Sequence, residues 1–287
     1  MKYARVREMS AAHAITTLCR CLELSRSGYY DWRDRGASAH ERTDHTLLPL
    51  VLQAAARCRG IYGDKKTWLH LRSQGHSIGK HRTARLRRQA GLEAKRKRRF
   101  RITVEHRHTP EAAPDLLERK FTASEPDRVW VGDMTFIRTR QGWLHLTMRL
   151  DLFSRRVVGW AMSERHDGAL YERALNMAIG QRRPAPGLIH HTDRGTMYST
   201  KAYRELIHGM GMRQSMNGRK SAYDNAVAES FFSNLKNELV HHCQFATREL
   251  AMASIFEYIE LFYNRQRIHQ SLGYVAPAQF EAMHRVA

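Results

Sequence analysis

The stretch Arg128-Val-Trp-Val-Gly-Asp-Met-Thr-Phe-Ile-Arg138 decides the fold of the second half of this chain. Its β-branched and aromatic residues predict a strand with Asp133 near its middle. A carboxylate in apolar surroundings is unfavourable unless something cationic binds it. We therefore expect Asp133 to belong to a cation-binding site.

Two further acids stand in similar surroundings. Asp193 follows a short apolar strand in Ile189-His-His-Thr-Asp-Arg-Gly195, and Glu229 lies inside a predicted helix. Any one of them alone is typical of an ordinary surface carboxylate. Together, on two strand ends and one helix, they predict a shared site for a divalent metal. Two Mg²⁺ ions held by such oxygens activate a water or a 3′-hydroxyl for phosphodiester chemistry.

The charge of the chain points to a polyanionic partner. The net charge is +20, and residues 1–125 hold 27 Lys and Arg against 13 Asp and Glu. Such a surplus favours nucleic acid. A membrane protein is not expected, because no apolar run approaches the roughly 20 residues of a membrane span. The start lacks the apolar core of a signal peptide, so we expect a cytoplasmic protein.

The cysteines give no reason to expect zinc. There are four in 287 residues, which is typical of reduced thiols in the cytosol. Cys19 and Cys21, with His13 nearby, lack the second pair of ligands that structural zinc sites usually have.

Residues 1–44 are predicted to form an N-terminal helical segment. Apolar residues recur at helical spacing over Ser10–Leu24, and Ser25 is a plausible N-cap for a second short helix. The pair fits a helix-turn-helix fragment or a plain helical hairpin equally well. The polar stretch Arg33–Thr43 is predicted to be a linker.

Residues 45–102 are predicted to form a basic, helix-turn-helix-like DNA-binding region. Helices are expected at Leu47–Cys58, with Pro49 in the first turn, at Lys65–Ser73, and from Ser77 or Gly79 to just before Gly91. A solvated basic face is the alternative interpretation of the last helix. The candidates for DNA contact are Lys80, Arg82, Arg85, Arg88, Lys95, Arg96 and Lys97. Residues 103–125 are the expected linker.

Residues 126–287 are predicted to form a mixed α/β sheet with flanking helices. Strands are expected at 128–138, 143–152, 156–162, 187–190 and 212–215, and helices at 169–180, 200–208, 223–240 and 247–263. In the helix of Glu229, a stripe of Val227, Phe231 and Leu235 is expected to face the core. Asn225, Glu229, Ser233 and Lys236 fall on a different face.

These residues resemble a known family. Asp133, Asp193 and Glu229, with thirty-five residues between the second and third, match the D,D(35)E signature of retroviral-integrase-like transposases. More closely, the chain resembles the second-frame (OrfB) product of bacterial IS3-family insertion sequences. The blocks that resemble this family are Trp130-Val-Gly-Asp-Met-Thr, Leu150-Asp-Leu-Phe-Ser-Arg-Arg-Val-Val-Gly-Trp160, His191-Thr-Asp-Arg-Gly195, Asp224-Asn-Ala-Val-Ala-Glu-Ser-Phe-Phe232 and Tyr263-Asn-Arg-Gln-Arg-Ile-His-Gln-Ser-Leu-Gly273.

The resemblance implies a ribonuclease-H-like fold and metal-dependent DNA cleavage and strand transfer at element ends. It implies that Asp133, Asp193 and Glu229 are catalytic and hold Mg²⁺, with Mn²⁺ able to substitute. It also implies an assembly of several copies on DNA and an upstream-frame (OrfA) partner or fusion. Further candidates for DNA contact near the acids are Arg194, Asn225, Lys236, Arg265, Arg267 and His269, the last with a structural role equally expected.

Two other functions are compatible with the same residues. A nuclease of this fold would hydrolyse nucleic acid without joining strands. A DNA-binding protein without catalysis would be a decayed element or a regulator, although all three acids are present.

Overall fold

The computed structural model describes residues 2–95, 113–218 and 225–284. The chain divides into two compact units, one of Met1–Arg59 with Gly63–Glu93 and one of Gly60–Tyr62 with Ala94–Ala287. In the part of the chain that the structure describes, no helix is long and apolar enough to cross a membrane.

The first unit consists of helices. They are α1 (Lys2–Met9), α2 (Ile15–Cys21), α3 (Arg26–Asp34), α4 (Ala39–Arg57), α5 (Asp64–Ser73) and α6 (Lys80–Gln89). Two separate apolar clusters hold them. The first unites α1 to α3 around Val6 and Tyr29, and the second unites α4 to α6 around Val51 and Leu86.

The predicted linker over Arg33–Thr43 is wrong, because α4 begins at Ala39. Ser38 and Glu41 form a reciprocal cap there: the Ser38 hydroxyl accepts from the Glu41 N–H, and the Glu41 carboxylate accepts from the Ser38 N–H. Pro49 therefore lies inside α4 and not in its first turn. The polar residues that suggested a linker are the solvated first turns of a long helix.

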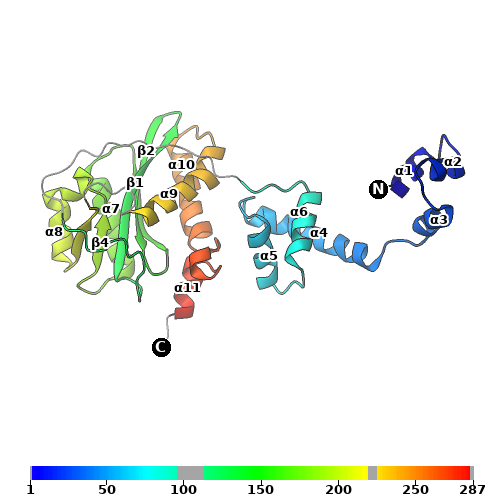
Figure 1. Ribbon diagram of the computed structural model, residues 1–287. Helices are drawn as coiled ribbons and strands as arrows, with labels where there is room; N and C mark the ends of the chain where they lie inside the picture. The colour runs from blue at the N-terminus through cyan, green and yellow to red at the C-terminus, as the bar shows by residue number, and fades with distance from the viewer. Residues whose placement is uncertain (1, 96–112, 219–224, 285–287) are drawn as a thin grey trace. The chain divides into compact units, whose positions relative to one another are not determined.

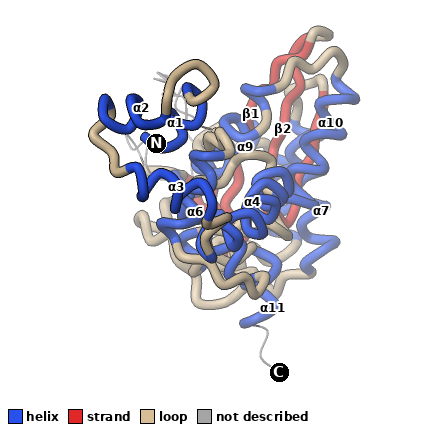
Figure 2. The backbone as a smooth tube through the Cα atoms, turned by 90° about the vertical axis from the view of Figure 1, so that its right-hand side faces the viewer, coloured by secondary structure: helices blue, strands red, loops and turns tan. Residues whose placement is uncertain are grey.

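The second unit is built on a five-stranded mixed sheet, as predicted. The strands are β1 (Val129–Thr139), β2 (Gly142–Asp151), β3 (Val157–Ser163), β4 (Ile189–Thr192) and β5 (Arg213–Met216), in the spatial order β3-β2-β1-β4-β5. The first three are antiparallel neighbours, whereas β4 pairs with β1, and β5 with β4, in parallel. β1 and β2 therefore form one long hairpin with shorter strands beside it (Figure 1, Figure 2).

Helices cover both faces of this sheet (Figure 1). On one side lie α7 (Gly168–Arg182) and α8 (Lys201–Gly209); on the other lie α9 (Ala226–Glu238) and α10 (Arg248–Phe256). The helix predicted over 247–263 is α-helical only to Phe256 and continues as a π-helix over Glu257–Tyr263. The remaining helices are α11 (Pro277–His284) and the 3₁₀ turns Thr196–Ser199, Val240–His242 and Gln270–Leu272.

The buried stripe of α9 differs from the predicted one. Phe231 and Leu235 are buried as expected, but Val227 is only half-buried, and Ala228 and Phe232 complete the stripe. The stripe is therefore rotated by one residue, which still leaves Glu229 on the exposed side of the helix.

Candidate active site

The sheet brings Asp133 and Asp193 next to each other. β1 and β4 pair in parallel from Val129 opposite Ile189 to Gly132 opposite Thr192, where the pairing ends. Asp133 and Asp193 are the next residues of these two strands. Because neighbouring strands lie about 4.8 Å apart, both side chains start close together, at the carboxyl end of β4 and partway along the longer β1.

The third acid is placed by the residue that precedes its helix. Asn225 is 2% exposed, and its side-chain Nδ2 donates to the Gly132 carbonyl oxygen at 3.1 Å. This bond fixes the start of α9 beside the residue that precedes Asp133. Glu229 lies in the first turn of α9, with its side chain exposed.

The three carboxylates interact electrostatically. The pKa of Asp133 is raised well above its ordinary value by burial first, then by the negative charge of Asp193, with a further contribution from Glu229. The Met134 N–H, which donates to Asp133 Oδ1 at 2.7 Å, opposes this shift, as does the Lys236 ammonium. Burial in turn lowers the pKa of Lys236. Two like charges therefore act on Asp133, and among the described residues the Lys236 ammonium opposes them.

The donor set suits a hard divalent cation, although no closed cage is formed. Among residues 2–95, 113–218 and 225–284, no three His, Cys, Asp or Glu side chains lie close enough together to hold a metal ion. All three donors are carboxylates whose mutual repulsion a cation would relieve. Mg²⁺ takes one or two protein carboxylates and completes its shell with water and phosphate oxygens, so an open set of this kind fits it.

A buried arginine, missed in the sequence, packs against the strand of Asp133. The Arg149 side chain is fully buried, and its Nη2 donates to Tyr203 Oη at 2.8 Å and to the Tyr171 carbonyl at 3.2 Å. A Cβ on Gly132 would lie 3.2 Å from Arg149 Cδ and from His190 Cε1. A larger residue before Asp133 would therefore require Arg149 or His190 to shift slightly. The signal was a charged residue within the apolar run of β2.

Three of the residues predicted to contact DNA near the acids have bonding partners within the second unit. Arg267 is 7% exposed and forms an ion pair with Glu238 at 2.7 Å; His269, 8% exposed, lies 3.3 Å from Arg267 Nη1. Asn225 is committed to Gly132, as described above. The sequence showed these polar groups but not their partners, which are distant in the chain.

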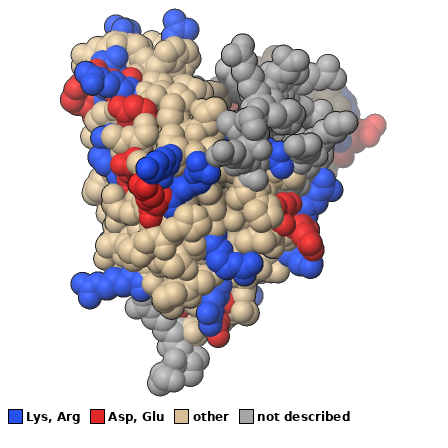
Figure 3. Space-filling model, turned by 90° about the vertical axis from the view of Figure 1, so that its left-hand side faces the viewer, with Lys and Arg blue, Asp and Glu red and all other residues tan. Residues whose placement is uncertain are grey.

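Three of the candidates near the acids remain at least partly accessible. Arg265 is exposed, and Lys236 is half-buried. Arg194 is also half-buried, and its Nε donates to the Asn217 carbonyl at 2.6 Å. On the face drawn in Figure 3, basic and acidic side chains are interspersed, so charge alone does not mark a path for DNA there.

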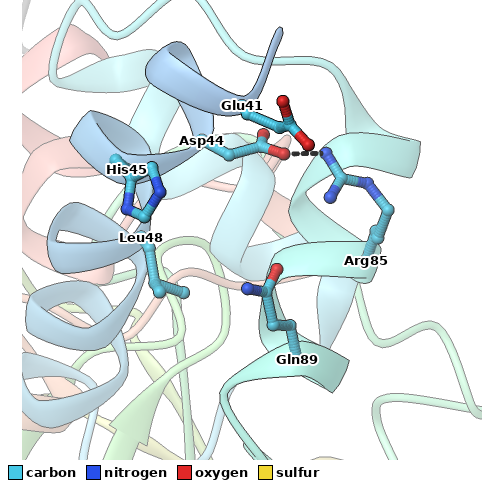
Figure 4. A pocket seen from close by; sticks show the side chains of 6 residues that line it. All are labelled: Glu41, Asp44, His45, Leu48, Arg85 and Gln89. Atoms are coloured by element: carbon cyan, nitrogen blue, oxygen red, sulfur yellow. Dashed lines mark hydrogen bonds and ion pairs between the residues drawn. The ribbon is translucent and has the colours of Figure 1, made fainter. Parts of the chain in front are cut away.

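The basic helix α6 is oriented by an acid of α4. Asp44 accepts from Arg82 at 2.7 Å and from Arg85 at 2.6 Å (Figure 4 shows the Arg85 pair). Lys80 and Arg88 are exposed on the same helix. A pocket of about 200 Å³ beside Arg85 belongs to this first unit, so it is not part of the acidic site.

The other candidates of the basic region follow α6. Lys95 Nζ donates to the Glu238 carbonyl at 3.1 Å. Arg96 and Lys97 lie outside the residues that the structure describes.

Comparison with known families agrees with this arrangement. Two integrase core domain profiles match residues 123–222 and 229–284, and a profile described as an HTH-like domain matches residues 41–100. The chain is similar in fold to a protein in the intasome of simian T-cell lymphotropic virus in complex with PP2A regulatory subunit B56 gamma. That likeness has a TM-score of 0.50 and 15% identity, and it covers 79% of this chain and 73% of the other.

Curated relatives match nearly the whole chain. An uncharacterized 31 kDa protein of insertion element IS600 from Shigella sonnei is 41% identical, over 94% of this chain and all of the relative. The transposase InsF for insertion sequence IS3A from Escherichia coli strain K12 is 38% identical, over 98% of both chains. With a helix-turn-helix-like domain before an integrase-type core, the chain belongs to the IS3 family of insertion-sequence transposases.

Proposed function

We propose that this transposase cleaves DNA and transfers strands at the ends of its insertion sequence through Asp133, Asp193 and Glu229. The observation that supports the proposal is the electrostatic effect of Asp193 and Glu229 on Asp133. Asp133 lies in β1 just past its pairing with β4, Asp193 directly follows β4, and Glu229 lies on a helix anchored to Gly132. Their mutual repulsion leaves the site ready for a cation.

Each residue has a definable task in this mechanism. Asp133, Asp193 and Glu229 would hold Mg²⁺, which supplies an activated nucleophile and stabilises the leaving oxygen when bound. Asn225 positions Glu229 by fixing the start of α9. Lys236, two turns further along α9, supplies a half-buried ammonium whose charge reaches Asp133 and would also attract a phosphate.

The remaining parts of the chain would bind DNA and assemble several copies of the protein on it. Residues 45–102 would contact DNA, with Lys80 and Arg88 exposed for phosphate contact and Lys95, Arg96 and Lys97 following. Residues 1–44 would form a separate helical segment, 103–125 a linker, and 126–287 the catalytic core. Several copies would act together on DNA, with an upstream-frame (OrfA) partner or fusion.

Nicking of a supercoiled plasmid in Mn²⁺ tests the proposal, because it requires no knowledge of the element ends. Glu229→Gln should lower the nicking rate by at least about a hundredfold, since a metal ligand contributes several kcal/mol of transition-state stabilisation. The matched control is Glu205→Gln on α8, an exposed acid outside the site. Its rate should equal that of the wild type.

Two results would contradict the assignment. Equal nicking by the wild type and Glu229→Gln would place the activity elsewhere or in a contaminant. Products that are always hydrolysed and never joined, on duplexes carrying the element ends, would indicate a nuclease instead of a transferase.

A further inference from the structure

Residues 2–34 form a small structural module that precedes the HTH-like match at 41–100. Helices α1, α2 and α3 lie together near the N-terminus (Figure 1), around a core of Val6, Leu18, Cys19 and Tyr29. This cluster is separate from the one that unites α4 to α6. Residues 2–34 therefore have an apolar core of their own, and the function of this module is considered separately from that of α4 to α6.

The connection between α2 and α3 has the length of the turn in a helix-turn-helix. Four residues separate Cys21, the last of α2, from Arg26, the first of α3. Glu23 in this turn has φ of 56°, in the left-handed region that such turns often fill with glycine. Ser25 then caps α3 by accepting from the Gly28 N–H at 3.3 Å.

The third helix distinguishes this arrangement from a plain hairpin of two helices. α1 closes against α3 so tightly that a Cβ on Gly28 would lie 2.5 Å from Tyr3 Oη. The rings of Tyr3 and Trp32 stack with centroids 5.8 Å apart. A glycine inside α3, normally unfavourable for a helix, is thus explained by the packing of α1.

This packing leaves polar side chains of α3 exposed beside the half-buried Tyr30 ring, and the Ser27 hydroxyl is bonded to that of Ser25 at 2.7 Å. Tyr29 is buried and Trp32 half-buried, whereas Arg26, Ser27 and Asp31 are exposed. These three side chains are of the kinds that recognise base edges in the major groove: arginine binds guanine, aspartate accepts from cytosine, and serine pairs with several bases.

The chemistry of this face favours nucleic acid over a protein partner. In the described residues, the large exposed hydrophobic side chains begin at Leu52, so the module presents none of them. Protein interfaces usually bury aromatic or aliphatic anchors. Arg20 on α2 and Arg26 on α3 are exposed, while Arg5 and Arg33 are paired with the acids Glu8 and Asp34.

We propose that residues 2–34 form a second helix-turn-helix, which binds double-stranded DNA with α3 in the major groove. It would act beside the HTH-like domain at 41–100 and read a separate block of base pairs. α2 would cross the phosphate backbone, as the first helix of this motif does. The proposal does not depend on catalysis at Asp133, Asp193 and Glu229.

The experiment is selection of bound sequences from a random duplex DNA library by the full-length chain. The test variant is Arg26→Ala with Asp31→Ala on α3. Its matched control is Arg5→Ala with Glu8→Ala, which also removes one exposed cation and one exposed acid, but from α1. A third variant, Lys80→Ala with Arg88→Ala, reports on α6. Circular dichroism melting of each variant checks that the helices remain folded.

The wild type should enrich a sequence with two blocks of preferred bases. The α3 variant should lose the preference at one block and bind the selected duplex roughly tenfold to a hundredfold more weakly, the range for one or two lost base contacts. The α1 control should keep the base preference at both blocks. The α6 variant should lose the preference only at the block that the α3 variant leaves intact.

Three results would overturn the proposal. In the first, the wild type enriches no sequence block that depends on α3. In the second, the α3 variant selects the same sequence as the wild type. In the third, the affinity of the α3 variant falls equally for all sequences, which would indicate phosphate contact without recognition of bases. Plasmid nicking, which needs no base preference, should be retained by the α3 variant. Failure here is therefore distinct from failure of the proposed catalytic function.

Discussion

The second unit contains two kinds of carboxylate that the fold treats in opposite ways. Glu238 and Glu281 are 9% and 2% exposed, and each is bonded to arginine. Glu281 accepts from Arg182 and Arg156 at 2.9 Å each, and these bonds lower its pKa even though burial opposes the shift. Asp133 faces other carboxylates, and its pKa is raised.

This difference separates carboxylates that stabilise the fold from carboxylates that are candidates for function. The paired acids attach the C-terminal segment to the rest of the unit, since Glu238 joins α9 to Arg267 and Glu281 joins α11 to α7. Asp133 has a raised pKa because of burial and of the negative charges of Asp193 and Glu229, and a bound cation would offset that electrostatic cost. A site that costs stability in this way is typical of function.

The largest effect on stability should come from breaking a paired acid. Arg267→Ala leaves Glu238 buried without its ion pair, and loss of one partner of a buried pair costs about 3–5 kcal/mol. Urea unfolding should show the decrease in the free energy of unfolding. Arg265→Ala, two residues earlier and exposed, is the matched control and should be near neutral. Equal effects of the two variants would mean that the pair does not stabilise the unit.

The two kinds of acid should respond to pH with opposite sign. The raised pKa of Asp133 means that its contribution to stability is present at low pH and is lost as the pH rises through that pKa. In metal-free buffer, Asp133→Asn should therefore melt higher than the wild type at pH 7, with the gap closing in acid. This is measured by thermal melting from about pH 3 to pH 8, a range that includes the ordinary carboxylate pKa of about 4.

Glu281 should show the opposite dependence of stability on pH. Its lowered pKa contributes stability that is present at neutral pH and lost as the pH falls through the folded-state pKa. Glu281→Gln should melt below the wild type at pH 7, and the difference should shrink in acid. A shift of the same sign in Asp133→Asn and Glu281→Gln would refute the comparison.

Magnesium should stabilise the protein only through the site of Asp133, Asp193 and Glu229. If Asp133, Asp193 and Glu229 bind Mg²⁺, the ion raises the melting temperature of the wild type by mass action. Mg²⁺ at 100 times its dissociation constant contributes about 2.7 kcal/mol. The increase should be lost in Asp133→Asn and kept in Glu281→Gln, as differential scanning fluorimetry would show. An equal increase in both variants would place the ion elsewhere.

The smallest effect is expected for an exposed pair. Lys201 and Glu205 lie 3.8 Å apart on α8 with side chains 86% and 66% exposed. Lys201→Ala should change the free energy of unfolding by no more than about 0.5 kcal/mol, because exposed helical pairs contribute little. A larger loss in urea unfolding would show that burial is not what separates the strong pairs from the weak ones.

The sequence by itself determined the mixed sheet and the positions of its strands along the chain, whereas their spatial order came from the structure. Alternation and β-branched residues are local signals, so β1, β2 and β3 were predicted to within a few residues. It also singled out three acids as candidates: Asp133 and Asp193 because each interrupts or follows an apolar strand, and Glu229 because it lies thirty-five residues beyond Asp193 in a predicted helix.

Only the tertiary structure decided which charges are partnered. Arg267 and His269 looked like DNA contacts, yet Glu238, 29 residues from Arg267, holds that arginine inside the unit. The role of Arg149 became clear only from the structure, in which it donates to Tyr203 Oη and to the Tyr171 carbonyl. The start of α4 was missed for a different reason, since its Ser38 cap is local and went unrecognised. A charge is visible in sequence, whereas its partner and its burial arise only when distant segments pack together.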